Sequence, residues 1–281
     1  MMGCVGAGSV ARARPGRAPS KLARPDASWV VFYGEDIALD RLAAFDVAVL
    51  DADFRGDVGQ LGRQGCEVLA YLSLGEIKKS SRLYRHLDDP GVLLAENPNW
   101  PDTFVCDVRR PSWQSLILDR ALPTLVARGF TGVFFDTLDT PPHLEQTDPD
   151  RYAGMRLAAI DLVRAIRRSF PDLVLLMNRG YALLPDLKPE LDGVVAESLL
   201  TTYDFAARTY KWVDQEQLTY HMQALQVLTF DPHILPILSL DYWECADTAT
   251  VREIYAQERG FGHNPYVAEV LLDRIFPEPP S

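Results

Sequence analysis

Eight short apolar segments alternate with helical segments along this sequence, and this alternation constrains the fold more than any other feature. Most of the segments are continuous apolar runs, which are typical of parallel strands buried on both faces. Eight strand–helix repeats within about 240 residues predict a single-domain (β/α)8 barrel, the TIM barrel architecture of the α/β class. The predicted strands span residues 29–34, 47–53, 67–76, 132–139, 173–180, 193–200, 234–242 and 260–268.

Apolar residues at helical spacing lie between these runs and predict the helices. The long helices are expected at residues 113–128, 151–170, 211–230 and 248–259. Pro123 is expected to kink the first of them, and Gly129 and Gly260 are expected at the C′ position that ends a helix. A doubly wound sheet is the alternative architecture, but no GxGxxG motif follows the first predicted strand.

The first 27 residues differ in composition from the rest of the chain. They are rich in Gly, Ala, Arg, Pro and Ser, so we expect a disordered leader at residues 1–27 and the barrel at residues 28–281. The sequence as given has no signal peptide, because no apolar h-region is present. The opening "MMGC" resembles the end of a lipoprotein cleavage box. Two alternatives therefore stay open: an ordinary disordered N-terminus, and a lipidated Cys4 behind a misplaced start codon.

Composition and charge restrict the classes of function. Hydrophobic residues make up 47% of the chain, yet no run approaches about 18 apolar residues, so we expect no transmembrane segment. The net charge of -11 argues against nucleic-acid binding and suits a neutral or cationic ligand. The four cysteines and five histidines lack CxxC, HxxxH or HExxH spacing, so we expect no metal and no cofactor.

Almost every predicted strand is apolar at its start and polar at its end. In a TIM barrel the carboxyl ends of the strands meet at one face, where the active sites of such enzymes lie. The longest strand-to-helix connection, residues 77–111, also opens on this face, and its Trp100 either stacks on a sugar or holds the loop in place. The polar strand ends predict a site formed by Tyr33, Asp51, Tyr71, Ser73, Glu76, Asp136, Asp139, Asn178, Arg179, Glu197, Ser198, Asp241 and Tyr242.

A barrel mouth rich in carboxylates and aromatic residues suits glycoside hydrolysis, which needs one protonated and one ionised carboxyl group. Asp136 and Glu197 are the two acids most directly backed by apolar strand, and burial next to a like charge raises the pKa of such a group. Asp139 lies beyond its strand and is a cap or a substrate contact. Glu76 is either a third participant or a partner for Arg179, the one cation in the set.

Six motifs in this order resemble glycoside hydrolase family 114, the endo-α-1,4-polygalactosaminidase-like TIM barrels: "YLSLGE", "DVRRPSWQ", "GFTGVFFDTLDT", "NRGYALLP", "VVAESLL" and "LDY". The similarity covers residues 29–275. It implies an α-1,4-linked, partly deacetylated galactosamine polymer as substrate. The family's aspartate after the fourth strand falls on Asp136, and its glutamate after the sixth falls on Glu197. The sugar sites would be lined by the residues of "YLSLGE" and by Asp51, Asn178, Arg179 and Asp241.

The resemblance also implies a retaining mechanism, with Asp136 as the nucleophile and Glu197 as the acid/base. Retention requires the carboxyl groups to lie about 5–5.5 Å apart, whereas about 6.5–9.5 Å would indicate inversion. An acidic cleft would attract galactosamine, a cation near neutral pH. We expect an extracytoplasmic location, secreted or lipid-anchored.

Two other classes of function stay open for this barrel. The first is a non-catalytic carbohydrate-binding protein, since the fold does not fix the function. The second is a hydrolase or lyase that holds a metal with Asp51, Asp53 and Glu76.

Overall fold

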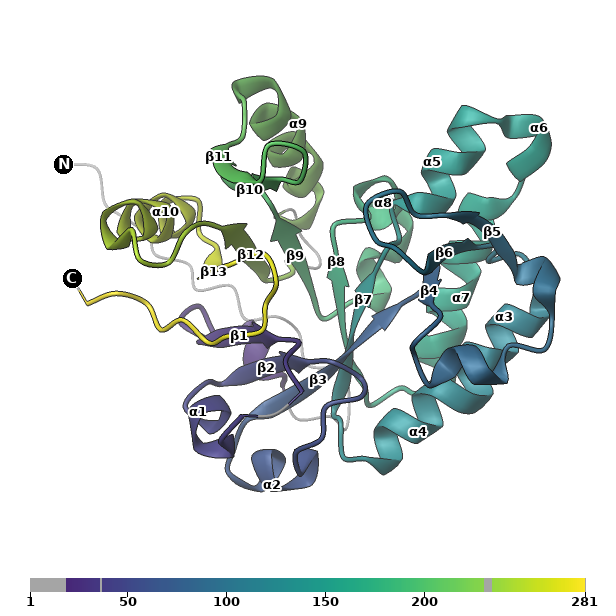
Figure 1. Cartoon of the computed structure of the whole chain (residues 1–281), viewed down its shortest axis with the longest axis horizontal. Coiled ribbons are helices and arrows are strands. Elements are labelled where there is room, and N and C mark those ends of the chain that lie inside the picture. The colour runs from purple at the N-terminus through teal and green to yellow at the C-terminus, as the bar shows by residue number, and fades with distance from the viewer. Residues whose placement is uncertain (1–18, 36, 230–233, 281) are drawn as a thin grey trace.

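The computed structural model of this chain describes residues 19–35, 37–229 and 234–280. Its centre is an eight-stranded parallel sheet that curls into a nearly closed barrel, with the strand order β1-β2-β3-β7-β8-β9-β12-β13 (Figure 1). The eight predicted strands and the (β/α)8 class are confirmed. The barrel strands are β1 (Trp29–Phe32), β2 (Val47–Leu50), β3 (Glu67–Ser73), β7 (Gly132–Asp136), β8 (Val174–Asn178), β9 (Gly193–Glu197), β12 (Ile237–Tyr242) and β13 (Asn264–Ala268).

The first and last strands approach each other and bring the sheet close to a complete ring. The indole Nε1 of Trp29 in β1 donates to the backbone carbonyl of Asn264 in β13 at 2.9 Å. Past the ends of these strands, the backbone N–H of Tyr33 donates to the carbonyl of Leu272 at 2.7 Å. Closure gathers the carboxyl ends of all eight strands around one mouth.

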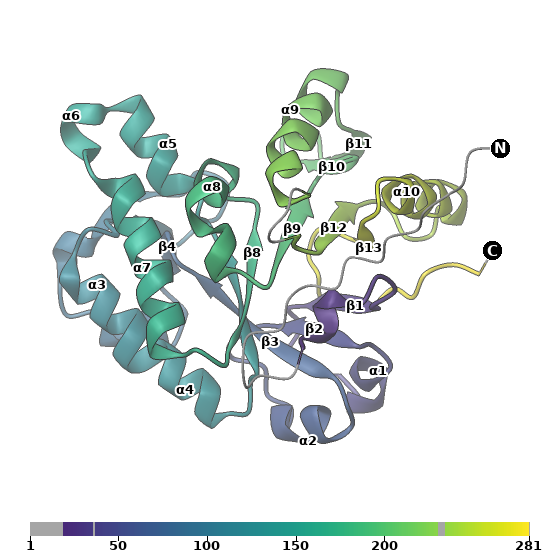
Figure 2. The same cartoon turned by 180° about the vertical axis from the view of Figure 1, so that it is seen from behind.

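The helices lie outside the sheet, as Figures 1 and 2 show from opposite sides. Together with the barrel strands they enclose a large apolar core that includes the fully buried Trp113 and Phe135. The α-helices are α1 (Leu39–Ala43), α2 (Val58–Arg63), α3 (Pro111–Ser115), α4 (Leu122–Ala127), α5 (Thr140–Thr147), α6 (Pro149–Tyr152), α7 (Met155–Ser169), α8 (Leu184–Leu187), α9 (Gln215–Leu225) and α10 (Thr248–Gly260).

Two of the predicted helices are divided in the structure. Residues 113–128 form parts of α3 and α4 with a π-helical segment, Leu116–Ala121, between them. Pro123 has no N–H to donate to the preceding turn, so a kink was expected there. In the structure the irregularity is the π-helical segment, which has a wider turn than an α-helix. Residues 151–170 form the end of α6 and then α7, because Gly154 adopts a left-handed conformation with φ of 84°.

The predicted starts and ends of other elements need correction. Residues 211–212 belong to a strand rather than a helix, and α9 starts at Gln215 behind the side-chain cap of Asp214. Residue 230 lies outside the described residues. Gly129 has φ of 97° after α4, as expected, but Gly260 still belongs to α10 and the left-handed residue is Gly262.

Residues 19–27, which the sequence analysis placed in a disordered leader, pack against the barrel, so for them the prediction was wrong. Lys21–Ala23 form a short 3-10 helix, and Leu22 is completely buried. The Ser20 hydroxyl donates to Glu67 Oε2 at 2.6 Å, at the start of β3. The rest of the predicted leader, residues 1–18 including Cys4, lies outside the described residues.

Two small antiparallel sheets extend the rim of the barrel at the carboxyl ends of its strands. One has the order β4-β6-β5, with β4 (Glu76–Lys78), β5 (Leu93–Glu96) and β6 (Thr103–Cys106), and follows β3. The other is a hairpin of β10 (Thr201–Asp204) and β11 (Thr209–Trp212), which follows β9 and projects beyond the barrel in Figure 1. The sequence analysis did not predict either sheet.

Candidate active site

Asn178 joins the two carboxylates that the sequence analysis selected as a catalytic pair. It ends β8, between Asp136 at the end of β7 and Glu197 at the end of β9. Its amide Nδ2 donates to Asp136 Oδ1 at 3.0 Å and to Glu197 Oε2 at 2.5 Å. The two acceptor oxygens are therefore separated by at most the sum of these distances, about 5.5 Å. Both acids face one mouth.

Three tyrosines surround this pair. Tyr71 donates its phenol hydrogen to Asp136 Oδ2 at 2.8 Å, and Tyr242 donates to Glu197 Oε1 at 2.6 Å. Tyr33 packs against Tyr71 with the ring centroids 5.0 Å apart. Burial raises the pKa of all three phenols, and the carboxylate charges raise it further. The three phenols stay protonated, and those of Tyr71 and Tyr242 act as hydrogen-bond donors.

Glu197 has the electrostatic environment of a general acid. Burial raises its pKa above the usual value, and the charge of Asp136 adds to this effect. Hydrogen bonds from Tyr242 and Asn178 act in the opposite direction without cancelling it. Glu197 therefore keeps its proton in a pH range where an exposed glutamate has lost it, which is what proton donation to a leaving group requires.

The chain turns sharply after each of the three central side chains. Thr137, Arg179 and Ser198 follow Asp136, Asn178 and Glu197, and they have φ of 62°, 48° and 55°. Left-handed backbone is costly for residues other than glycine and is concentrated at functional sites. The turns end the strands earlier than predicted and leave the preceding side chain pointing into the mouth.

The turn after Asp136 is held by a hydroxyl. Thr137 Oγ1 bonds to the hydroxyl of Ser73 at 2.8 Å and accepts the N–H of Gly75 at 2.8 Å. A Cβ on Gly75 would lie 2.4 Å from the carbonyl oxygen of Thr137, so only glycine permits this approach. The predicted site residue Ser73 therefore contacts the turn behind Asp136.

Asp51 and Glu76 lie farther from the pair. Asp51 Oδ1 accepts the N–H of Asp53 at 2.7 Å, and burial raises the pKa of Asp51. Burial also raises the pKa of Glu76, whose two oxygens accept from Asn97 Nδ2 at 3.1 and 3.0 Å. Both residues are linked to the site through charge. The charge of Asp51 raises the pKa of Tyr33, and the charge of Asp136 raises the pKa of Glu76.

Arg179 pairs with Asp139, so the suggested partnership of Arg179 with Glu76 was wrong. The Arg179 Nε lies 3.4 Å from Asp139 Oδ2, and the N–H of Gly180 donates to Asp139 Oδ1 at 3.0 Å. Burial raises the pKa of Asp139, and the charge of Arg179 opposes this effect. The pair lies beyond the ends of β7 and β8, on the outer part of the rim.

One of the predicted rim residues, Asp241, does not offer its side chain to the mouth. Asp241 is completely buried, and its Oδ1 accepts the N–H groups of Leu200 and Thr201 at 2.8 and 2.7 Å. Successive side chains of a strand point to opposite faces, so Tyr242 faces Glu197 while Asp241 faces the helices. Ser198, another predicted rim residue, is buried, and its backbone N–H donates to the carbonyl of Leu240 at 2.8 Å.

The proposed metal ligands do not form a cluster. Asp53 pairs with Arg82 at 3.0 Å, and Glu76 is occupied by Asn97. Among the described residues, no group of three or more His, Cys, Asp or Glu side chains has the arrangement needed to hold a metal ion.

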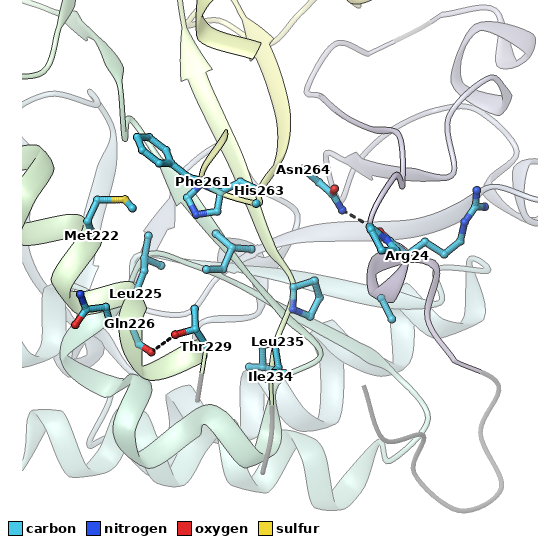
Figure 3. Close-up of a pocket in the computed structure, with 15 residues that line it drawn as sticks. Arg24, Met222, Leu225, Gln226, Thr229, Ile234, Leu235, Phe261, His263 and Asn264 are labelled. Carbon is cyan, nitrogen blue, oxygen red and sulfur yellow. Dashed lines mark hydrogen bonds between the residues drawn. The ribbon is translucent and has the colours of Figure 1, made fainter. Parts of the chain in front are cut away.

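A pocket of about 280 Å³ lies at the opposite end of the barrel, before the starts of β12 and β13 (Figure 3). Its lining is largely apolar, with Leu225, Ile237 and Phe261 among the contributing residues. Asn264 in this pocket donates to the carbonyl of Arg24 at 3.0 Å. None of the lining residues is acidic, so we assign the candidate active site to the Asp136–Glu197 mouth.

Sequence reasoning missed two residues that shape the site, Asn97 and Thr137. Asn97 lies in the segment "NPNWPD", whose asparagine and proline residues predict a turn. This composition does not predict that Asn97 contacts Glu76. Thr137 follows Asp136 directly, and only its left-handed backbone reveals its role.

Comparison with known proteins defines the class of this barrel. The glycoside hydrolase domain of PelA from Pseudomonas aeruginosa is 30% identical, with a TM-score of 0.76, over 89% of this chain and 98% of that domain. A variant of the same domain gives 29% identity and a TM-score of 0.78 with the same coverage. Ega3 from Aspergillus fumigatus, in complex with galactosamine, shares the fold at 12% identity, with a TM-score of 0.66 over 94% of this chain and 98% of Ega3. The chain is a TIM-barrel glycosidase.

The family follows from the sequence match. Residues 11–279 match glycoside hydrolase family GH114, so this chain belongs to that family. An uncharacterized protein of Deinococcus radiodurans is 26% identical over 217 residues, which cover 75% of this chain and 67% of that protein. The resemblance found in the sequence is thereby confirmed. In the part of the chain that the structure describes, no helix is both long and apolar enough to cross a membrane.

Proposed function

We propose that this glycosidase cleaves an α-1,4-linked, partly deacetylated galactosamine polymer, with Asp136 and Glu197 as the catalytic pair. The observation that carries the proposal is the bridge by Asn178 Nδ2, which holds one oxygen of each carboxyl group within about 5.5 Å of the other. Two carboxyl groups in one mouth, one of them with a raised pKa, are what glycoside hydrolysis needs.

The proposed reaction has two steps and retains the configuration of the sugar. Asp136 attacks the anomeric carbon while Glu197 gives its proton to the departing glycosidic oxygen. Glu197, now ionised, then takes a proton from a water molecule that attacks the glycosyl–Asp136 ester. The short separation favours this course, because inversion needs room for water between the carboxyl groups, about 6.5–9.5 Å.

The substrate assignment rests on charge and on the relatives. The net charge of -11 and the acidic rim residues Asp51, Glu76 and Asp139 would attract a polymer that carries free amines. Ega3, which has the same fold, was solved with galactosamine bound. A substrate of this kind is an external polysaccharide, so we propose an extracytoplasmic enzyme. Whether it is secreted or anchored through Cys4 depends on residues outside those described.

The test uses two variants that keep the size of each side chain. Asp136→Asn and Glu197→Gln should each reduce hydrolysis of deacetylated α-1,4-galactosaminan by about 10³-fold or more, because each removes one of the two roles. Circular dichroism and the melting temperature should remain close to those of the unaltered protein. Near-normal turnover by either variant would contradict the assignment.

The stereochemistry and the rival function are tested in the same assay. Proton NMR of the first product should show the α-anomer, and a β-anomer would indicate inversion with Asp136 as the base. The rival is a non-catalytic carbohydrate-binding barrel. Binding of the polymer without new reducing ends would favour that rival and overturn the proposal.

A further inference from the structure

A row of six aromatic rings lies on the rim beside the candidate active site and takes no part in the proposed chemistry. Three of the rings are exposed, with 47%, 46% and 38% of the surface of Trp100, Phe205 and Trp212 accessible. The other three are half-buried. In spatial order the row, which we call the aromatic ridge, consists of Trp100, Phe205, Tyr203, Tyr210, Trp243 and Trp212.

Each ring of the aromatic ridge contacts the next. The successive distances between ring centroids are 5.4, 5.2, 5.0, 6.3 and 5.9 Å, all within the range of aromatic pairs. The rings come from three connections at the carboxyl ends of the barrel strands. Trp100 lies between β5 and β6, the next ring is Phe205 of the β10–β11 hairpin, and Trp243 follows β12.

The β10–β11 hairpin separates its side chains by face. Tyr203 and Tyr210 are paired directly across the hairpin, and Trp212 lies two positions after Tyr210 on the same face. The opposite face carries the ion pair of Lys211 with Asp204, whose atoms are 2.7 Å apart. Exposed aromatic side chains gathered on one face of a polar hairpin mark a binding surface.

The loops that carry the aromatic ridge adjoin the elements that carry the catalytic pair. Trp243 directly follows Tyr242, whose phenol donates to Glu197. β10 begins shortly after Glu197, so the hairpin is attached to the strand that carries this acid. At the other end, Trp100 shares its loop with Asn97, which holds Glu76. The ridge is therefore built from loops that leave the same end of the barrel as the catalytic pair.

We propose that the aromatic ridge binds the sugar units of the amino-sugar polymer that flank the cleaved linkage. This inference rests on the proposed function of the site. Aromatic rings offer an apolar face to the C–H face of a pyranose and an electron-rich face to its ammonium group, and a cation over an aromatic ring is attracted to it. A partly deacetylated galactosamine chain supplies both kinds of group, so the ridge favours long, deacetylated chains.

The test compares ridge variants with an exposed aromatic residue outside the ridge. Trp212→Ala and Phe205→Ala are combined with Glu197→Gln, and affinity electrophoresis in gels that contain deacetylated galactosaminan gives the dissociation constants. Each ridge variant should bind the polymer about five- to tenfold more weakly. Trp212→Phe should restore most of the affinity. Tyr220→Ala, which removes a 60% exposed ring from α9, should leave the affinity unchanged.

A second measurement uses oligomers of defined length with the ridge variants that retain Glu197. The loss of kcat/KM should grow with the length of the oligomer, because only longer chains reach the ridge. Equal affinity and equal length dependence in Trp212→Ala, Phe205→Ala and the unaltered protein would overturn the inference while hydrolysis itself stands. Tryptophan-dependent binding without any hydrolysis would instead overturn the proposed function and support the ridge. A protein that neither binds nor cleaves the polymer would overturn both.

Discussion

At the scale of single residues, the amide of Asn178 determines the geometry of the candidate pair. Its two N–H groups donate to two carboxylates, which fixes the orientation of the amide because its carbonyl oxygen would be repelled by them. The carbonyl Oδ1 is buried and finds no partner among the described residues.

Removal of this amide should lower the rate and shift its pH dependence. Asn178→Ala should reduce kcat by about 10²-fold, because the pair and the substrate lose a fixed hydrogen-bonding group. The hydrogen bond from Asn178 stabilises the ionised form of Glu197 and lowers its pKa. Without this hydrogen bond the pKa of Glu197 should rise. The alkaline limb of the kcat/KM profile, where Glu197 loses its proton, should move to higher pH.

Asn97→Ala is the matched control for this prediction, since it removes an asparagine that donates to Glu76 rather than to the pair. It should leave the alkaline limb in place. Equal profiles for Asn178→Ala and the unaltered protein would show that the bridge does not tune Glu197.

At the scale of elements, the strands of the barrel are closely packed at their starts. Gly132 opens β7 between β3 and β8, and a Cβ at this position would lie 2.5 Å from Val174 Cβ and 2.6 Å from its carbonyl oxygen. Both of these neighbours belong to or adjoin the strand backbone and cannot move aside. On its other side β7 pairs with β3, in the register that brings Ser73 level with Asp136.

Gly132→Ala should therefore destabilise the barrel by about 2–3 kcal/mol, because the extra methyl group overpacks the contact between β7 and β8. Gly193→Ala, at the equivalent first position of β9, is the comparison. There the nearest neighbour is the end of the Leu176 side chain at 3.1 Å, which can adjust, so the loss should be smaller. Urea denaturation measures both, and equal losses would argue against the role of the tight contact.

At the scale of the whole molecule, a buried acidic network joins the barrel to the helix layer. Glu258 of α10 is completely buried, and His263 Nδ1 lies 2.7 Å from its Oε2. Burial raises the pKa of Glu258 to about 7 and lowers the pKa of His263 to about 4. Burial and the nearby Glu258 also raise the pKa of Asp241. At neutral pH the imidazole is neutral, and its Nδ1 shares a hydrogen bond with Glu258 Oε2.

Two groups of this network contribute to the pH dependence of stability, and their contributions have opposite signs. Glu258 has a pKa of about 7 in the folded protein, compared with 4.5 for the unperturbed group. The folded state therefore binds more protons than the unfolded state between these values. The contribution of Glu258, about 3 kcal/mol, is complete below pH 4.5 and is lost as the pH rises through 7. The lowered pKa of His263 acts in the opposite direction, because its contribution is complete above pH 6.5 and is lost as the pH falls through about 4.

Glu258→Gln removes the contribution of Glu258, because glutamine does not ionise, and leaves that of His263, so the stability of the variant should rise more steeply between pH 5 and about pH 6.5 than that of the unaltered protein. The free energy of unfolding is measured between pH 5 and about pH 8. Glu253→Gln removes an exposed carboxylate from the same helix and serves as the control, with the slope of the unaltered protein expected. A slope that is the same in Glu258→Gln would place the pH dependence elsewhere.

The sequence by itself determined the architecture of this protein and the two acids of its candidate site. Continuous apolar runs are local signals, because a strand buried on both faces needs apolar residues at every position. The eight strands follow from these runs, and the change from apolar to polar residues places Asp136 and Glu197 at one face of the barrel. The family match agrees with that assignment of fold and class.

Only the tertiary structure decided which polar groups meet. Asp241 and Tyr242 are neighbours in the sequence, yet one faces the helices and the other faces Glu197, because the direction of a side chain depends on the pleat and on the exact end of the strand. Arg179 pairs with Asp139 rather than with Glu76. The aromatic ridge also joins rings from three distant loops. Such contacts arise from closure of the barrel, which brings together residues that no local pattern relates.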